Sequence, residues 1–337
     1  MPKKTFRQAV HEALAQEMRR DPTVVIVGED ISGGLGSPGE QDAWGGPQGV
    51  TKGLMPEFGR SRVLDTPISE SAFIGAAVGA AATGLRPVAD LMFVDFMGVC
   101  FDQIFNQAAK FRYMFGGRAV TPLVIRTMYG AGLRAASQHS QSLYPVFTHI
   151  PGLKVVIPSS PYEAKGLLTE AIRDDDPVVF FEHKTLYDVE EDVPDEAYTI
   201  PFGEANLTRE GDDVSIVAIG RMVNLANEAA DNLQRDNIQC TVVDPRTTSP
   251  MDEDTIIETV EDTGRLVVVD EASPRCSIAT DISALVAERA FTALKGPIRM
   301  VRPPHTPVPF APELEDAYIP NVHDICEAVR SLVGKSQ

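Results

Sequence analysis

One stretch decides the fold: residues 62–94, which read RVLDTPISESAFIGAAVGAAATGLRPVADLMFV. A strand-like run at 62–65 ends before Pro67, and a helix rich in Gly and Ala is expected over 72–83. A second apolar run, at 88–94, follows that helix. Strand, helix and strand in this order are typical of a parallel sheet covered by helices.

The same alternation extends along the whole chain. In the first half, strands are expected at 24–27, 62–65, 88–94, 123–127, 154–157 and 177–181, with helices at 6–17, 72–83, 96–115 and 162–173. In the second half, strands are expected at 214–219, 240–243, 265–269 and 298–301, with helices at 222–235, 252–261, 278–290 and 324–333. The predicted fold class is α/β, with two doubly wound domains in series.

An acidic segment without periodicity separates the two halves. It runs from Asp188 to Pro201 and contains two prolines, which is typical of a domain linker. We therefore expect a first domain at 1–190, a linker at 191–203 and a second domain at 204–337. A chain of 337 residues is long enough for two such domains.

Composition excludes several classes of function. The formal net charge is -18, with 48 acidic against 30 basic residues, so neither nucleic acid nor an anionic membrane is an expected partner. No apolar run reaches the roughly 18 to 20 residues that a membrane span needs. The four cysteines are isolated, which argues against a disulfide framework or a zinc site and favours a cytoplasmic protein.

A glycine motif offers a competing interpretation. Residues 34–39 read GLGSPG and fit G-x-G-x-x-G, the dinucleotide-binding pattern. That pattern needs a helix directly after the turn, but Pro38 lies inside it and no helical period follows. We expect a loop here, and a nicotinamide-dependent oxidoreductase stays only as an alternative.

Glu70 is the strongest candidate for a catalytic or binding residue. It follows Pro67 at the point where a strand ends and the Gly/Ala-rich helix begins. One interpretation is structural: Thr66 or Ser69 caps the helix, and the Glu70 carboxylate favours the N-terminal dipole. The other is that Glu70 is a functional carboxylate at the end of a strand.

A wider set of motifs resembles one protein family. The sequence is similar to β subunits of the thiamine-diphosphate-dependent first component of 2-oxo acid and acetoin dehydrogenase complexes. The motifs that carry the resemblance lie in both halves: DTPISE at 65–70, GLRP at 84–87, DQ at 102–103, NQAAK at 106–110, QHSQ at 138–141, PGLKVV at 151–156, AKGL at 164–167 and RT at 246–247. The segments 42–46, 111–117, 248–254 and 279–284 are most similar to acetoin dehydrogenase β subunits.

The resemblance implies a fold and a set of site residues. The domains would be an N-terminal thiamine-pyrimidine-binding domain and a C-terminal transketolase-C-like domain. Glu70 matches the carboxylate that bonds the pyrimidine ring, and His139 matches the histidine that handles the substrate and the lipoyl group. The residues assigned to the cofactor site with Glu70 are Phe96, Met92, Ile68 and Glu29. Phe96 and Met92 could instead be ordinary core residues.

The resemblance also implies metals and partners. No Gly-Asp-Gly occurs, so a partner α subunit would hold most of the diphosphate and its magnesium. A potassium ion is possible near Leu123, Ala171, Ile172, Asp174 and Asp176, although this segment could equally be a charged helix end before Pro177. The implied assembly is an α2β2 heterotetramer that docks a dihydrolipoyl acetyltransferase.

The implied reaction is cleavage of the small molecule acetoin, with transfer of a two-carbon unit to the lipoyl group of the acetyltransferase. Pyruvate or a branched-chain 2-oxo acid is the alternative substrate. A non-catalytic scaffold that only docks partners is a further alternative, in which Glu70 and His139 would be dispensable.

Overall fold

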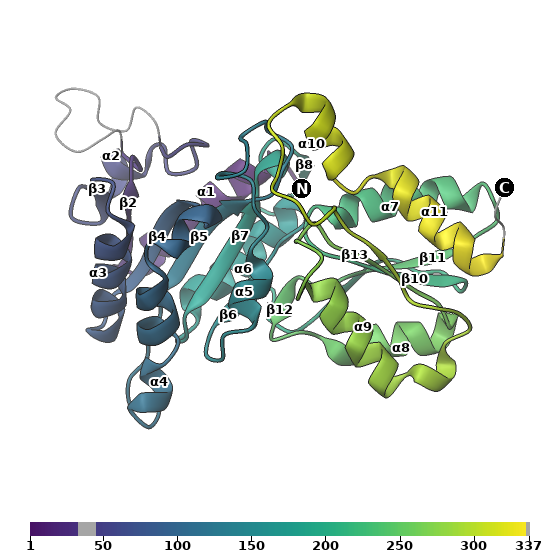
Figure 1. The fold of residues 1–337 in the computed structure, drawn as a ribbon. Helices are drawn as coiled ribbons and strands as arrows, with labels where there is room; N and C mark the ends of the chain where they lie inside the picture. Colours follow the sequence, from purple (N-terminus) through teal and green to yellow (C-terminus); the bar gives the residue numbers. More distant parts are fainter. Residues whose placement is uncertain (33–44, 335–337) are drawn as a thin grey trace. The chain divides into compact units, whose positions relative to one another are not determined.

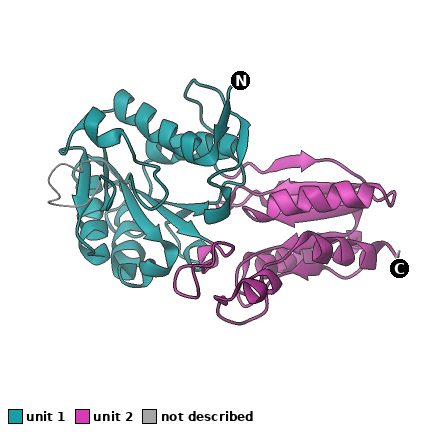
Figure 2. Cartoon of the chain, turned by 90° about the horizontal axis from the view of Figure 1, so that it is seen from above, with its two compact units in different colours: residues 1–129, 146–202 teal, residues 130–145, 203–337 magenta. Residues whose placement is uncertain are grey.

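The computed structural model describes residues 1–32 and 45–334 of the chain. These residues form two compact units, shown in different colours in Figure 2. Unit 1 consists of residues 1–129 and 146–202, and unit 2 consists of residues 130–145 and 203–337. Residues 130–145, which include His139, thus belong to unit 2, although the chain before and after them belongs to unit 1.

Unit 1 is built on a parallel sheet with the strand order β6-β7-β5-β4-β2-β3 (Figure 1). The strands are β2 (Val24–Glu29), β3 (Val63–Thr66), β4 (Arg86–Phe93), β5 (Val124–Tyr129), β6 (Lys154–Val156) and β7 (Val178–His183). Most of their residues are buried, as apolar runs predict for a sheet covered on both faces.

Helices cover this sheet. Helix α1 (Phe6–Arg20) and helix α6 (Pro161–Arg173) share one core cluster with alternate residues of the strands. Helix α3 (Glu70–Ala82) packs against β2 and β4. Local sequence defines the ends of these helices: Thr5 and Gln8 form a capping box on α1, and Ser160 caps α6 ahead of Pro161.

The prediction of a single helix at 96–115 was wrong. The structure instead has a 3-10 turn η1 (Val94–Gly98), a π-helix η2 (Gln103–Ala108) and a short helix α4 (Phe111–Met114). The amide of Ala109 donates to the carbonyl of Ile104, five residues back, at 3.1 Å. This wider turn shifts the helical register, which a continuous 3.6-residue period does not anticipate.

The segment before unit 2 is attached to unit 1. Strand β8 (Glu190–Asp192) pairs antiparallel with strand β1 (Lys3–Thr5). Further along, Tyr198 stacks on Tyr162 with ring centroids 4.7 Å apart, and Ile200 joins the core cluster of unit 1. The remaining elements of this unit are α2 (Leu54–Phe58) and η3 (Lys184–Leu186). Helix α5 (Tyr144–Thr148) begins in the segment 130–145 of unit 2 and ends in unit 1.

Unit 2 has a second sheet with the order β14-β13-β10-β11-β9, in which only β9 is antiparallel among the described strands. The strands are β9 (Asn206–Arg209), β10 (Val214–Ala218), β11 (Cys240–Asp244), β13 (Leu266–Val269) and β14 (Arg299–Val301); β12 (Thr247–Ser249) follows β11. Helices α7 (Met222–Gln234) and α11 (Val322–Val333) share one core cluster with this sheet.

Helices α8 (Glu253–Thr263) and α9 (Ile278–Arg289) lie on the opposite face of that sheet in Figure 1. Helix α10 (Pro312–Tyr318) follows the proline-rich loop, and η4 (Phe291–Ala293) is a short turn. The predicted α/β class, with helices on both faces of mostly parallel sheets, is confirmed. Among the described residues, every helix is too short or too polar to cross a membrane.

Candidate functional site

Most of the site residues predicted in unit 1 lie at the carboxyl ends of neighbouring strands. Glu29 ends β2 and is in register with Thr66, which ends β3. Glu70 is the first residue of α3, directly after β3. Strand β4, which carries Met92, pairs with the other side of β2. Because these strands are parallel neighbours, their carboxyl ends meet at one edge of the sheet, where α/β proteins bind ligands.

Carboxylates gather at this edge. Burial raises the pKa of Glu29, and the nearby charges of Asp30, Glu70 and Asp65 raise it further. Glu70 is 9% exposed. Its charge also contributes, after burial, to raising the pKa of Cys100 to about 12. Such a group of carboxylates favours a ligand that brings hydrogen-bond donors or shares a proton with a carboxylate.

The structural interpretation of this segment is supported only in part: Glu70 lies in the first turn of α3, where the helix dipole favours a carboxylate. Ser69 is the N-cap of α3, but its side chain makes no capping bond and its hydroxyl donates to the carbonyl of Pro67 at 3.0 Å. Asp65 Oδ1 accepts the amide of Ser32 at 3.2 Å. Within the described part of the chain, Asp65 Oδ2 and the hydroxyl of Thr66 are buried without a hydrogen-bond partner. Buried polar atoms are normally paired, so these oxygens are available to accept a further hydrogen bond.

Apolar side chains lie at the end of β4. Met92 is half-buried and packs against the core cluster of unit 1. Phe96 is half-buried in η1, and its ring meets Phe93 edge-on with centroids 5.7 Å apart. Ile68 is different, because it is 77% exposed. Met92 and Phe96 can contact a ring at this edge, whereas Ile68 is available to a partner.

His139 belongs to unit 2. It is half-buried in the loop that leaves β5, and its amide donates to the carbonyl of Ala136 at 3.4 Å. The structure thus groups Glu70, Glu29, Met92 and Phe96 in unit 1 and places His139 in unit 2.

A buried charged network in unit 1 was missed by the sequence analysis. The guanidinium of Arg126 pairs with both Glu182 and Asp90, and all three side chains are buried. They line a cavity of about 10 Å³ beneath residues 45–50, which is the size of one water molecule. A signal was present, since each of these charged residues interrupts an apolar strand run.

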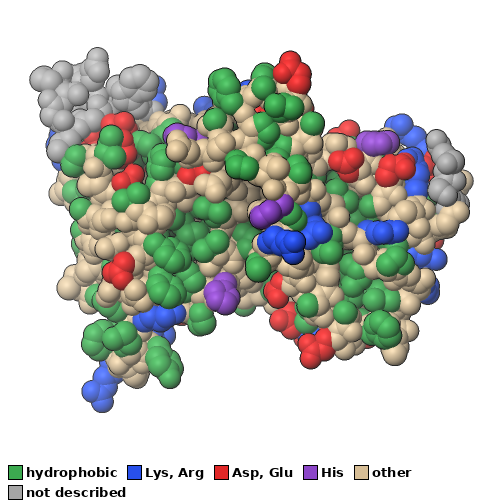
Figure 3. Space-filling view, in the orientation of Figure 1, with side chains coloured by type: hydrophobic (Ala, Val, Ile, Leu, Met, Phe, Trp, Pro, Cys, Tyr) green, Lys and Arg blue, Asp and Glu red, His purple; other side chains and the backbone are tan. Residues whose placement is uncertain are grey.

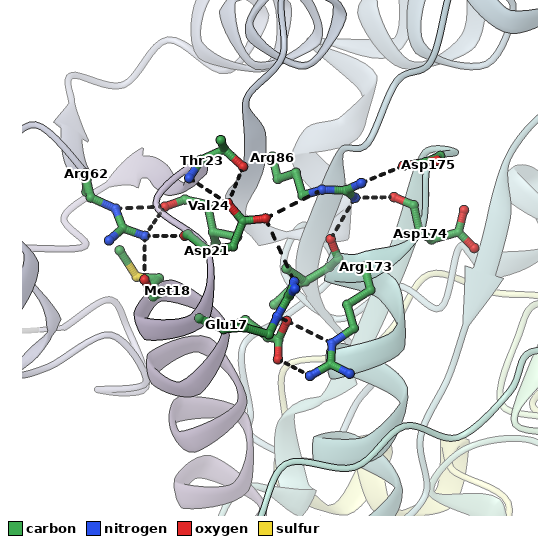
Figure 4. A network of polar contacts seen from close by, with 12 residues as sticks. Glu17, Met18, Asp21, Thr23, Val24, Arg62, Arg86, Arg173, Asp174 and Asp175 are labelled. Carbon is green, nitrogen blue, oxygen red and sulfur yellow. Dashed lines mark hydrogen bonds and ion pairs between the residues drawn. The ribbon is translucent and has the colours of Figure 1, made fainter.

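The turn predicted for potassium carries several ion pairs (Figure 4). Nη1 of Arg86 donates to the carbonyl oxygens of Ile172 and Asp174 at 3.1 and 2.9 Å, and Nη2 pairs with Asp175 at 2.5 Å. Lys154 pairs with the Asp174 carboxylate at 2.5 Å, and Arg112 pairs with Asp176. Since a guanidinium already occupies two of the expected carbonyls, this arrangement does not favour a further cation at those oxygens.

Another expected potassium ligand, the carbonyl of Leu123, also has a partner. The Leu123 carbonyl accepts the amide of Val178 at 2.8 Å, and Ala171 lies in the last turn of α6. Potassium stays a prediction, and a melting temperature that is higher in potassium than in sodium chloride would support it. The GLGSPG motif at 34–39 lies outside the described residues.

An exposed apolar surface surrounds α4. Tyr113 is 91% exposed, and Met114 and Phe115 are also largely exposed. Figure 3 shows hydrophobic side chains at this end of unit 1. Exposed aromatic side chains in a group are typical of a surface that meets another protein.

Comparison with known proteins gives matches along nearly the whole chain. Residues 2–190 match the family model of the transketolase pyrimidine-binding domain, and residues 203–325 match that of the transketolase C-terminal domain. A solved structure described as a split-gene transketolase, an inactive β4 tetramer, superposes with a TM-score of 0.78. It is 21% identical and covers 99% of each chain, so this likeness shows the fold alone.

Sequence relatives are closer. Acetoin:2,6-dichlorophenolindophenol oxidoreductase subunit β of Cupriavidus necator is 66% identical over 328 residues, which cover 97% of each chain. The protein with the same description in Bacillus subtilis is 57% identical over 98% of this chain and 97% of its own. The pyruvate dehydrogenase E1 component subunit β of Rickettsia felis is 44% identical over 97% of this chain and 98% of its own.

Proposed function

The chain belongs to the family of transketolase-like dehydrogenase β subunits, and on this basis we propose that it is the β subunit of a thiamine-diphosphate-dependent acetoin dehydrogenase. The predicted family is confirmed by the identity of 66% to an acetoin oxidoreductase β subunit. The same identity, against 44% for a pyruvate dehydrogenase β subunit, is the observation that favours acetoin over pyruvate.

The residues at the carboxyl edge of the unit 1 sheet fit the pyrimidine half of thiamine diphosphate. The ring carries nitrogens that can share a proton with Glu70, and the unpaired oxygens of Asp65 and Thr66 can accept from its amine. Phe96 and Met92 provide an apolar surface for a ring. When bound, this cofactor supplies a carbon nucleophile and an electron sink.

The proposed overall reaction breaks the bond between C2 and C3 of acetoin. Acetaldehyde leaves, and the remaining acetyl group becomes a thioester on the lipoyl arm of a dihydrolipoyl acetyltransferase. The lipoyl disulfide takes up two electrons and one sulfur keeps a proton, so the reaction balances. An artificial dye can accept the two electrons in place of the lipoyl group.

Particular residues of this chain would hold and move the protons. Glu70, which is buried at the start of α3, shares a proton with the pyrimidine ring when the cofactor is bound. His139 carries an imidazole, which can give or take a proton as the acetyl group moves to sulfur.

An α subunit would supply the magnesium and most of the diphosphate contacts, because the chain has no Gly-Asp-Gly motif. The exposed apolar residues around α4, together with Ile68, support a subunit contact in an α2β2 assembly. All four cysteines are free, which supports a cytoplasmic location.

The assignment of Glu70 is tested in the complex with an α subunit. We expect Glu70→Ala to lower thiamine-dependent reduction of dye by acetoin by about 10²- to 10⁴-fold, as for the loss of a proton-transfer group. Glu57→Ala is the matched control, because Glu57 is an exposed glutamate of the same unit that pairs only with Arg19 in the described structure. Equal activity of Glu70→Ala and Glu57→Ala would contradict the assignment.

A further inference from the structure

The loop that carries His139 is a closed segment of unit 2. The amide of Gly130 donates to the carbonyl of Gln141 at 3.1 Å and so joins the two ends of the loop. Inside it, the hydrogen bond from His139 to Ala136 forms a tight turn. The position of the imidazole therefore depends on how the backbone of residues 130–141 is held.

Several residues of this loop have a backbone conformation that favours glycine. The angle φ is +108° at Gly132, +56° at Arg134 and +62° at Ala136. For residues other than glycine, this conformation is strained and persists only where the surroundings impose it. Left-handed residues that alternate with ordinary ones turn their amides toward a common point, which makes a concave site for an anion.

The anion at that point is the carboxylate of Glu315, from helix α10. Its side chain is 0% exposed. Oε1 accepts the amide of Gly132 at 2.8 Å, and Oε2 accepts the amide of Arg134 at 3.1 Å. Oε2 also accepts Nη1 of Arg134 at 2.7 Å. One buried carboxylate thus fixes two amides and one guanidinium of the loop.

Further contacts attach the loop to the same part of unit 2. The amide of Ala131 donates to Glu271 at 2.6 Å, and the hydroxyl of Ser137 donates to the carbonyl of Val308 at 2.7 Å. Nη2 of Arg134 pairs with Asp316 at 2.6 Å. Ala131 and Val308 also pack with Tyr318 and Ile319 in a small apolar cluster.

We propose that Glu315 is a positioning residue for the reaction: it holds the loop 130–141 in the strained conformation that presents His139 for acetyl transfer. This inference rests on the proposed role of His139. Glutamine at this position would keep the size of the side chain, but its amide nitrogen would face a backbone N–H and one accepting oxygen would be lost. The loop would then relax out of its left-handed conformation.

The test measures acetyl transfer to a lipoyl domain in the assembled complex. We expect Glu315→Gln to lower kcat by about 10²-fold with little change in KM, since small misplacement of a catalytic group costs about this much. Glu313→Gln on the same helix is the matched control, because Glu313 is exposed. We also expect faster amide hydrogen exchange across residues 130–141 in Glu315→Gln alone.

A double variant separates positioning from general stability. If Glu315 acts through His139, the double variant His139→Ala/Glu315→Gln has the same kcat as His139→Ala alone, because the two changes remove the same function. Effects that multiply, or a Glu315→Gln kcat equal to that of the control, would overturn the inference while leaving the role of His139 intact. Unchanged transfer by His139→Ala would overturn both.

Should Glu315→Gln fail to assemble, Glu315→Asp provides the same comparison with the charge kept and the reach shortened. We expect it to give an intermediate kcat and the same lack of additivity with His139→Ala. Transfer at the control rate by Glu315→Asp, with unchanged hydrogen exchange in the loop, would overturn the inference.

Discussion

Arg126 donates through Nε and Nη2 to both carboxylate oxygens of Glu182, at 2.6 and 2.8 Å. Its Nη1 donates to Asp90 at 2.7 Å, and the hydroxyl of Tyr187 donates to Glu182 at 2.8 Å. All these groups are buried inside unit 1: Asp90, Arg126 and Glu182 lie on three neighbouring strands, and Tyr187 directly follows η3. Burial raises the pKa of Asp90, and the charge of Arg126 opposes that shift.

Removing the cation from this network should be strongly destabilising. We expect Arg126→Met to lower the free energy of unfolding by about 3–5 kcal/mol, because it leaves Glu182 and Asp90 buried without their partner. Urea denaturation followed by circular dichroism measures the change. Arg289→Met is the control, since Arg289 pairs with exposed Glu253 and Asp254, and its loss should leave the free energy of unfolding almost unchanged. Equal losses for the two variants would contradict this account.

Glu29 should make stability depend on pH in a defined direction. Burial and neighbouring carboxylates raise its pKa in the folded chain above the ordinary value of 4.5, so its ionisation disfavours the folded state. Glu29→Gln should therefore increase the urea midpoint at pH 7.5, where the wild-type carboxyl is ionised. Below pH 4.5 the carboxyl is protonated in both folded and unfolded chains, and this gain should disappear. A gain that grows as the pH falls would show that the sign is wrong.

Phe96 should contribute to cofactor affinity. Loss of one aromatic contact is worth about 0.5–1.5 kcal/mol, so Phe96→Ala should raise the Kd for thiamine diphosphate by roughly 2- to 12-fold in the assembled complex. Isothermal titration calorimetry measures that affinity. Phe291→Ala removes a phenylalanine that is 70% exposed in unit 2, and it should leave the Kd unchanged. An unchanged Kd in Phe96→Ala would assign this ring to the core alone.

Much of the fold was predictable because local and long-range preferences agree. The apolar runs at Val24–Glu29 and Arg86–Phe93 form buried parallel strands, and Pro67 does separate a strand from a helix. The carboxyl-edge location of Glu70 follows from that local order alone. By contrast, the π-turn at Ala109 depends on how η2 packs against α3, which no periodicity records.

The support of the His139 loop could not be predicted. Glu315 is 183 residues from Gly132 in the sequence, and as one acidic residue in a short acidic helix it resembles Glu313. Only the folded chain distinguishes the two, because it buries Glu315 against amides of a distant loop and leaves Glu313 exposed. The Arg126 network could be predicted in part. The sequence shows charged residues inside apolar strand runs, but it does not show which of them pair with one another.

The most direct test of the central claim is substrate choice by the complex of this chain with an α subunit. Thiamine-diphosphate-dependent dye reduction is measured with acetoin, with pyruvate and with branched-chain 2-oxo acids at equal concentrations. The account predicts the highest kcat/KM with acetoin. A higher kcat/KM with pyruvate would keep the family and the roles of Glu70 and His139 but contradict the acetoin assignment.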